Sequence, residues 1–96
     1  MIPKASRLKD EKALRDVRML PCCICGRCPV DAAHIVSRGA GGPDARWNLL
    51  PLCRIHHQEQ HKIGFFRMCV KYVPLRLKLA ALGWEFEGIK LRRREP

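Results

Sequence analysis

The sequence predicts a small α+β domain in which a short β-hairpin is flanked by helices. Helical apolar patterns occur at both ends of the chain, and a central segment of short extended runs separates them. In addition, residues 22–61 contain five of the six cysteines and all four histidines. At 96 residues, hydrophobic burial alone would leave one domain marginally stable, so bound metal is expected to contribute.

Residues 1–20 are predicted to form a basic N-terminal helix, with the helical pattern in residues 6–20. Its apolar residues fall at near-helical spacing with charges between them: Leu8, Ala13, Leu14, Val17 and Leu20. Pro21 ends the pattern, because the residue before a proline is disfavoured in a helix. The apolar stripe is expected to cover the centre of the domain. The basic residues would face solvent or phosphate: Lys9, Lys12, Arg15 and Arg18.

Residues 21–64 form the predicted core. In order, it comprises a tight turn over residues 21–29, a strand over 30–36, a glycine-rich turn over 37–44 and a second strand or extended segment over 46–52. The glycine-rich turn lacks the Gly-Lys-Ser/Thr ending of a phosphate-binding P-loop and does not open a helix. We therefore expect a hairpin loop.

A helix that begins at Cys53 or Arg54 is predicted to carry three of the histidines and to pause near Gly64. Its apolar pattern then continues to Pro74. A further helix runs from Pro74 to Gly83, with proline inside its start and glycine just past its end, as is common for helices.

The C-terminal extension, residues 65–96, is predicted to be helical and basic. It ends in a short hairpin, with strands at residues 84–87 and 89–92 around Gly88. The chain has no internal repeat, no low-complexity segment and no long linker. Residues 1–96 are therefore expected to form a single domain.

Two short ligand pairs predict a structural zinc site. Cys22 and Cys25 are separated by two residues, and Cys53 and His56 have the same spacing after a hairpin-length insert. This spacing lets two soft ligands reach one ion, and four such ligands give the tetrahedral geometry that zinc prefers. The four residues are therefore assigned to one Zn²⁺.

Spacing alone does not fix the first pair, because Cys25 and Cys28 are equally well separated. We prefer Cys22 with Cys25 because Gly26 follows, at a position where a positive φ is commonly required. Cys28 would then take no part. Cys69 lies on an apolar helix face and is expected in the hydrophobic core.

The remaining histidines offer a second site. His57 and His61 are four residues apart, so on a helix they share one face and can bind a second ion, while His56 turns away. His34 lies upstream on the predicted first strand, and Asn48 lies between. One segment thus supplies a zinc site, a second metal site and an imidazole that neither ion uses.

The charge balance indicates a polyanionic partner. The formal net charge is +10, from 19 Lys and Arg against 9 Asp and Glu. Residues 1–20 carry six basic and three acidic side chains and residues 62–96 carry nine and three, whereas the centre is nearly balanced. Basic flanks around a histidine-rich centre suit nucleic acid bound through its phosphates, although a basic surface that serves solubility alone has the same composition.

Six cysteines in a short chain also occur in secreted disulfide scaffolds. The first residues form no apolar signal segment, and no apolar run reaches the roughly 18 residues needed to cross a bilayer. We therefore expect a cytoplasmic protein of a bacterium or a phage-infected cell, with reduced thiolates that bind metal and with no membrane partner.

These residues resemble the HNH endonuclease family. The likeness rests on Ala33-His34-Ile35, on Asn48 and on the run Leu52-Cys53-x2-His56-His57. The His57-x3-His61 pair is similar to the colicin-type branch, the two zinc pairs are similar to the zinc-stapled branch, and the sequence is nearest to small phage and prophage HNH proteins. The resemblance implies a zinc-stabilised ββα-metal, treble-clef-like core within one nuclease domain.

The family's chemistry implies a role for each residue. His34 would act as general base on water, and Asn48 would hydrogen-bond backbone across the hairpin and hold His34 in line. A divalent ion, Mg²⁺, Mn²⁺ or a similar one, held by His57 and His61 would polarise the phosphate and neutralise the leaving 3′ oxygen. The expected activity is hydrolysis of DNA phosphodiester bonds, which leaves 5′-phosphate and 3′-hydroxyl ends.

The chain departs from the family at Ala33, where Asp or His normally precedes the general base and binds the metal. Asp31 lies on the same face of the strand, since side chains repeat every second residue, and is a candidate ligand directly or through water. Candidate phosphate contacts are Arg38, Arg46, Arg54 and Lys62.

Two other functions fit the same sequence. A non-catalytic, zinc-dependent nucleic-acid-binding module would keep the scaffold and lose the chemistry at Ala33. A recombination accessory protein would cut only with a protein partner. RNA as substrate, a homodimer and the choice between nicking and double-strand cleavage all stay open.

Overall fold

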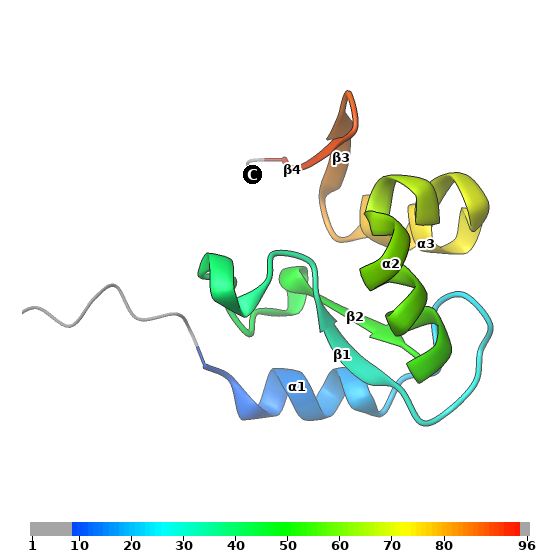
Figure 1. The fold of residues 1–96 in the computed structure, drawn as a ribbon. Coiled ribbons are helices and arrows are strands. Elements are labelled where there is room, and N and C mark those ends of the chain that lie inside the picture. The colour runs from blue at the N-terminus through cyan, green and yellow to red at the C-terminus, as the bar shows by residue number, and fades with distance from the viewer. Residues whose placement is uncertain (1–8, 95–96) are drawn as a thin grey trace, which may run out of the picture.

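The computed structural model describes residues 9–94, which form an α+β fold of three α-helices and two two-stranded antiparallel sheets. In chain order the elements are α1 (Glu11–Arg18), β1 (Asp31–His34), the 3₁₀ turns η1 (Arg38–Ala40) and η2 (Arg46–Asn48), β2 (Leu49–Leu52), α2 (Arg54–Lys71), α3 (Val73–Ala81), β3 (Trp84–Glu87) and β4 (Lys90–Arg93) (Figure 1). The predicted fold class is confirmed at this level.

Helix α1 is shorter than the predicted N-terminal helix. It begins after Asp10, whose side chain accepts a hydrogen bond from the Ala13 backbone N–H at 3.1 Å and so caps the helix. Residues 6–8 of the predicted helix lie outside the described residues. The buried side chains of Ala13, Leu14 and Val17 pack against Leu49 of β2, so α1 covers one face of the central hairpin.

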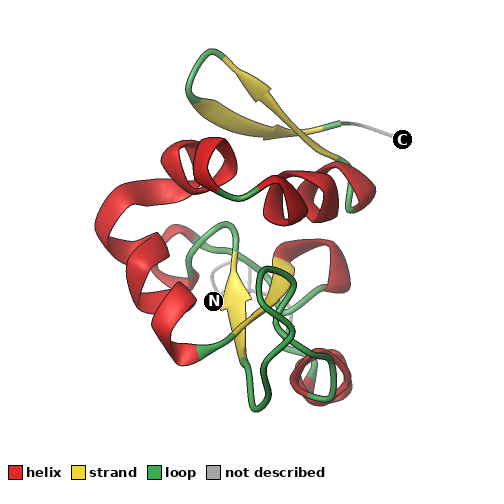
Figure 2. Cartoon of the chain, turned by 90° about the vertical axis from the view of Figure 1, so that its right-hand side faces the viewer, coloured by secondary structure: helices red, strands yellow, loops and turns green. Residues whose placement is uncertain are grey.

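The hairpin of β1 and β2 pairs Asp31 with Leu52 at one end and His34 with Leu49 at the other. Both strands are shorter than predicted. The ladder stops after His34 because a 3₁₀ turn, η2, precedes β2, and the Asn48 side chain then takes over the bonding to the Val36 backbone. Figure 2 shows the hairpin between helices. Because helices cover the hairpin, Ala33 of β1 and all four residues of β2 are buried.

Helix α2 bends at Gly64, whose backbone angles of φ 81° and ψ 166° are not helical, so the predicted pause is confirmed. Such a φ favours glycine, which has no Cβ. The Tyr72 hydroxyl donates to Glu59 Oε1 at 2.7 Å, and the Lys71 ammonium bonds the same carboxylate. These contacts join the end of α2 to its first half, across the bend. Helix α3 follows with Pro74 in its first turn, as predicted.

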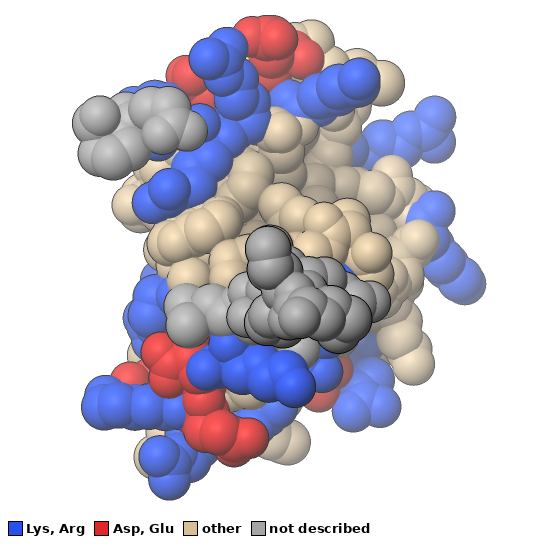
Figure 3. Space-filling view, turned by 90° about the vertical axis from the view of Figure 1, so that its left-hand side faces the viewer, with Lys and Arg blue, Asp and Glu red and all other residues tan. Residues whose placement is uncertain are grey.

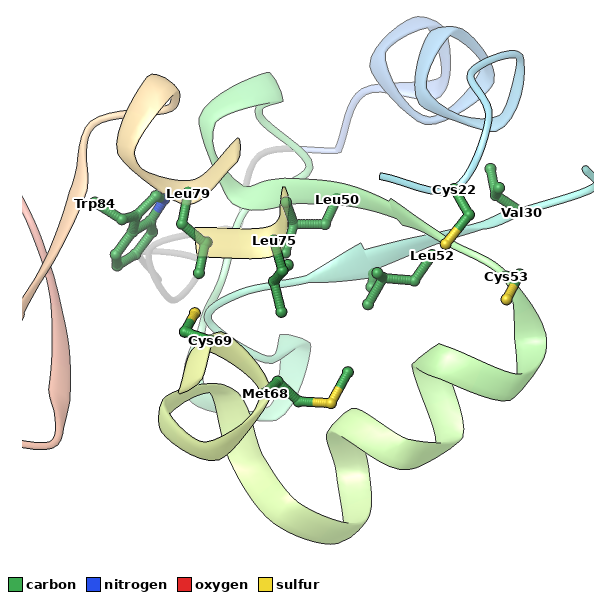
Figure 4. Close-up of a cluster of buried hydrophobic side chains, with 11 residues drawn as sticks. Cys22, Val30, Leu50, Leu52, Cys53, Met68, Cys69, Leu75, Leu79 and Trp84 are labelled. Atoms are coloured by element: carbon green, nitrogen blue, oxygen red, sulfur yellow. The ribbon is translucent and has the colours of Figure 1, made fainter. Parts of the chain in front are cut away.

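The second face of the hairpin meets the C-terminal elements in the main core. Leu50 and Leu52 of β2 point toward Met68 on α2 and Leu75 on α3 (Figure 4). Three further members of this cluster continue it toward the β3–β4 hairpin: Cys69, Leu79 and Trp84. Cys69 is therefore a core residue, as predicted, and burial raises the pKa of its thiol to about 11.

The C-terminal extension is anchored to the loop that precedes β2. The indole Nε1 of Trp84 donates to the backbone carbonyl of Trp47 at 2.7 Å, and the Arg93 guanidinium stacks on the Trp47 ring at 4.2 Å from its centroid. Residues 84–93 thus pack onto the part of the chain that carries Asn48. Within residues 9–94, no helix has both the length and the apolar character needed to span a bilayer.

Candidate functional site

The turn before β1 has the geometry of a metal-binding knuckle. The Gly26 backbone N–H donates to the Cys22 carbonyl at 2.8 Å, and the Cys22 N–H donates to the Arg27 carbonyl at 2.9 Å. Gly26 has a φ of 77°, as the choice of Cys22 with Cys25 required. The turn therefore directs two cysteines toward the start of α2.

The four predicted zinc ligands converge there. The ligand atoms of Cys22, Cys25, Cys53 and His56 all lie within 4.8 Å of one another. The Sγ atoms of Cys25 and Cys53 are 3.8 Å apart, and His56 Nδ1 is 3.7 Å from Cys22 Sγ and 3.3 Å from Cys53 Sγ. A tetrahedral zinc ion requires about 3.8 Å between two sulfurs and about 3.6 Å between sulfur and nitrogen. This Cys₃His cluster therefore fits a metal such as zinc.

The protonation of the cysteines agrees with this assignment. Burial raises the pKa of the Cys22 thiol, but hydrogen bonds from the backbone of Cys53 and Cys25 outweigh it and lower that pKa to about 6. Burial raises the pKa of neighbouring Cys23 to about 12, so Cys23 stays a thiol. Cys28 is exposed and lies outside the cluster. The geometry thus favours Cys22 with Cys25 over the competing pair of Cys25 with Cys28.

A second pair of ligand atoms lies on the exposed face of α2. His57 Nε2 and His61 Nε2 are 3.2 Å apart, and the two rings lie 4.8 Å apart between centroids. On the other edge of His57, Nδ1–H donates to Asp31 Oδ2 at 2.9 Å. A carboxylate on the far nitrogen is the usual arrangement for a metal-binding histidine, because it fixes the tautomer and the ring orientation.

Asp31, the tentative third ligand, lies beside His57 and bonds protein side chains. Its carboxylate bonds His57 Nδ1 and also accepts two hydrogen bonds from Arg54, at 3.0 and 3.2 Å. Within residues 9–94, the Cys₃His cluster is the group of three or more ligand atoms close enough to hold one ion, so Asp31 is not grouped with His57 and His61. The geometry favours Asp31 as the residue that orients His57, in place of a ligand.

One pocket of about 370 Å³ brings the predicted general base together with the predicted pair of metal-binding histidines. Its lining includes His34, His57 and His61, with Asp31, Arg18 and Arg38 around them. Side chains alternate along β1, so Ala33 packs in the main core and His34 lies on the opposite face, the one that α1 covers in part. The structure therefore places these three histidines at a common surface.

Asn48 is fully buried and bonds the hairpin loop, as predicted. Its Oδ1 accepts from the Val36 N–H at 2.7 Å, and its Nδ2 donates to the carbonyls of Val36 at 3.0 Å and Pro43 at 2.9 Å. These three bonds hold the backbone on both sides of the loop that follows His34. The expected positioning role has a structural basis, and its effect on catalysis stays a prediction.

Sequence reasoning missed Asp44. The Oδ1 atom of this buried carboxylate lies 2.7 Å from His34 Nε2, and a guanidinium nitrogen of Arg38 lies 3.8 Å from the same oxygen. The sequence offers a weak signal, an acidic residue after the glycines and Pro43, with no spacing rule that links it to His34. Arg18, one of the basic residues expected to face solvent or phosphate, is contributed to the pocket by α1.

A family model described as "Protein of unknown function (DUF968)" matches residues 1–64. The chain belongs to the DUF968 family. It is also 40% identical over 63 residues to "Uncharacterized protein YdfU" of Escherichia coli strain K12, across 62% of this chain and 18% of that protein. The chain thus spans less than a fifth of the length of this relative. A search of solved structures found no match.

The DUF968 match contains the Cys₃His cluster and all of the histidines. It ends at Gly64, where α2 bends, so the second half of α2, α3 and the β3–β4 hairpin lie beyond it. The Cys₃His cluster and the pair of His57 and His61 therefore belong to the part of the chain that DUF968 describes, and the C-terminal elements supply core packing around them.

On one face of this DUF968 protein, basic side chains lie at both ends of the molecule, with acidic side chains among them (Figure 3). The face in Figure 3 shows Lys and Arg over the end that carries α1 and over the end that carries the β3–β4 hairpin, with a band of other residues between them. Of the predicted phosphate contacts, Arg38 lines the pocket and is half exposed, whereas Arg54 is paired with Asp31. Arg46 and Lys62 are exposed.

Proposed function

We propose that this DUF968 protein is a metal-dependent endonuclease of the HNH type that hydrolyses DNA phosphodiester bonds. The observation that carries the proposal is the shared pocket of His34, His57 and His61. The order of elements supports it: a knuckle, a hairpin that carries His34 and a helix that carries His57 and His61 are what a ββα-metal, treble-clef-like core would contain.

The pair of His57 and His61 fits a catalytic divalent ion. Metal–nitrogen bonds of about 2.1 Å at angles of 90° to 110° require about 3.0 to 3.4 Å between the two nitrogens, and 3.2 Å lies in that range. The same distance suits a hydrogen bond between the rings, so the bond from His57 to Asp31 is what favours an ion. Bound there, the ion would polarise the phosphate and neutralise the leaving 3′ oxygen.

The ligand types also bear on which ion is preferred. Imidazole nitrogens suit Zn²⁺, Ni²⁺ and Cu²⁺, whereas Mg²⁺ prefers carboxylate and water oxygens. Because Asp31 is engaged by His57 and Arg54, two imidazoles dominate the site. We therefore expect transition-metal ions to support cleavage better than Mg²⁺ does.

His34 would act as the general base. Its side chain is 12% exposed and lines the pocket next to the His57 and His61 edge, so it can accept a proton from an attacking water. Asn48 holds the loop behind it. Attack on phosphorus with departure of the 3′ oxygen would leave 5′-phosphate and 3′-hydroxyl ends.

The basic residues at the pocket suit a nucleic acid substrate. Arg18 and Arg38 reach the pocket from α1 and η1, and the whole chain carries a net charge of +10. Phosphate contacts of this kind give affinity without sequence preference and weaken as salt rises. Thiolate ligands further suit a reducing compartment, so we propose the cytoplasm of a bacterial or phage-infected cell.

A plasmid assay tests the proposal. Zinc-loaded wild-type protein with supercoiled plasmid and Mn²⁺, Ni²⁺, Zn²⁺ or Mg²⁺ should nick or linearise the DNA, and His34→Ala should reduce the rate by about 10² to 10⁴-fold. Gln58→Ala, on the same helix but exposed and outside the pocket, is the control and should cut like the wild type.

One observation favours a second function. Ala33 is buried at the position where the HNH family carries a metal ligand. A non-catalytic nucleic-acid-binding module would retain the same fold. Binding of the plasmid without cleavage under every ion tested would support that module. Cleavage that requires an added host extract would instead indicate an accessory nuclease with a protein partner.

A further inference from the structure

We propose that Asp44 is the positioning residue that makes Nδ1 of His34 the proton-accepting atom. The inference rests on the proposed function, in which His34 is the general base. Asp44 Oδ1 lies 2.7 Å from His34 Nε2. The side chains are 4% and 12% exposed, so water competes little for this contact.

The chemistry of the pair fixes the tautomer. An ionised carboxylate only accepts hydrogen bonds, so the bond to Asp44 must be donated by Nε2–H of His34. In a neutral imidazole the other nitrogen then keeps its lone pair. Nδ1 is thereby the atom that can take a proton from water, and the imidazolium formed on transfer lies against a negative charge that stabilises it.

Asp44 is held by elements that themselves have defined positions. The Asp10 backbone N–H, at the N-cap of α1, donates to Asp44 Oδ2 at 3.3 Å. The preceding residue, Pro43, accepts from Asn48 Nδ2 at 2.9 Å. The carboxylate is therefore fixed from the start of α1 and from the hairpin, which gives α1 a part in the site beyond its apolar packing.

His34 and Asp44 differ in their access to the pocket, so they would have different roles in the reaction. His34 lines the pocket with His57 and His61, whereas Asp44 is not among the residues that line it. Asp44 can therefore act on the ring without contacting the substrate. A purely structural ion pair would make the same contact, so the test needs a readout that stability alone does not move.

The first readout is the tautomer of His34, measured by ¹⁵N NMR of the imidazole in the zinc-loaded full chain, with the His34 signals identified by their loss in His34→Ala. The wild type should show a protonated Nε2 and an unprotonated Nδ1. Asp44→Ala should give a mixture, and Asp44→Glu should restore the wild-type signals. Asp44→Asn should favour Nδ1–H, because its amide can donate to Nε2.

The second readout is the rate of plasmid nicking at saturating protein. Asp44→Ala should lower this rate by about 10²-fold, the low end of what a general base contributes, with little change in the DNA concentration required. Asp44→Glu should recover most of the rate. Asp16→Asn, which removes an exposed carboxylate of α1, is the control and should nick like the wild type. Zinc content and far-UV circular dichroism verify that each variant is folded.

The outcomes distinguish the two proposals. If His34→Ala is inactive but Asp44→Ala keeps both the wild-type rate and the Nε2–H tautomer, the positioning role of Asp44 is overturned and the nuclease stands. If the wild type cuts no DNA, the nuclease fails, and the NMR measurement still decides whether Asp44 sets the tautomer. A folded Asp44→Ala that loses rate without any change of tautomer also overturns the inference.

Discussion

His57 and His61 direct their Nε2 atoms at each other from one turn of α2, 3.2 Å apart, while Asp31 bonds the opposite edge of His57. Helical periodicity puts the two rings on one face, and the carboxylate selects the nitrogen that stays available. The arrangement brings the two Nε2 atoms together in the pocket that His34 also lines. Its consequences can be measured without any assay of cleavage.

Replacement of either His57 or His61 should remove one metal equivalent and leave the other. The zinc-loaded wild type is expected to bind one further Ni²⁺ in a calorimetric titration, whereas His57→Ala and His61→Ala should bind none at the same concentrations, because one imidazole is a weak ligand. Gln58→Ala should titrate like the wild type. Full binding by both histidine variants would refute the second site.

Asp31→Asn should weaken that second ion without abolishing it. Loss of a hydrogen-bonding partner behind a metal ligand typically costs about 10- to 100-fold in affinity, since the ring is less well oriented and less basic. Arg54→Ala removes the other partner of Asp31 and keeps the bond to His57, so it should have a smaller effect. An equal loss in both variants would show that surface charge, and not orientation, is responsible.

The two exposed cysteines of the knuckle provide a matched test of the zinc site. Cys25→Ser should lose zinc and unfold residues 21–64, whereas Cys28→Ser should keep both, because Cys25 Sγ lies 3.8 Å from Cys53 Sγ and Cys28 is outside the cluster. Structural zinc contributes about 10–16 kcal/mol in zinc-finger peptides, as much as the whole stability of a small domain. Elemental analysis and circular dichroism measure the two outcomes, and zinc loss from Cys28→Ser would reverse the assignment.

The zinc ligands and the bend at Gly64 could be predicted because each depends on short-range constraints. The two-residue spacing between Cys22 and Cys25 limits where their sulfurs can point. A glycine inside a helical pattern indicates a place where the helix can break. The contact of Asp44 with His34 depends instead on how the loop between these two residues closes. That path is set by Asn48 and by α1, which no local spacing reports.

The lengths of the strands and the bonding partners of Asp31 could not be predicted from the sequence, for a related reason. An extended pattern over residues 46–52 does not reveal that Asn48 is better satisfied by the Val36 and Pro43 backbone, which ends the ladder at Leu49. Alternation did place Asp31 on the side of α2. Alternation does not determine whether the Asp31 carboxylate binds an ion or bonds Nδ1 of His57.

Gly42 should tolerate no side chain. A Cβ at this position would lie 1.8 Å from the Val36 carbonyl oxygen and 2.9 Å from Asn48 Nδ2, so the backbone of the hairpin loop would have to move. Gly42→Ala is expected to destabilise the zinc-loaded protein by about 1–3 kcal/mol or more in urea unfolding.

Gly39→Ala is the control for that substitution, because nothing lies within 4 Å of its added Cβ and its φ is not positive. Its stability should change by less than about 0.5 kcal/mol. Equal stability of both variants would mean that the loop is not held against Val36 as described.

The contact of Glu59 with the end of α2 should make stability depend on pH in a defined direction. The Lys71 ammonium, followed by the Tyr72 hydroxyl, holds the pKa of Glu59 below its usual value of 4.5. A carboxyl whose pKa is lowered in the folded state stabilises that state above its unfolded pKa, and the contribution is lost as pH falls through the folded value. Glu59→Gln should therefore lower Tm by a few degrees at pH 7, and the difference from wild type should narrow only as pH drops below 4.5.

Melting curves at successive pH values, from 7 down to the acid limit of folding, measure this difference. Glu87→Gln is the control, because its pair with Arg92 is exposed at the surface of the C-terminal hairpin and does not join two parts of a helix. It should change Tm little at any pH. If Glu59→Gln behaves in the same way, the bend of α2 is held by Gly64 and core packing alone, and the contacts of Lys71 and Tyr72 with Glu59 do not contribute to it.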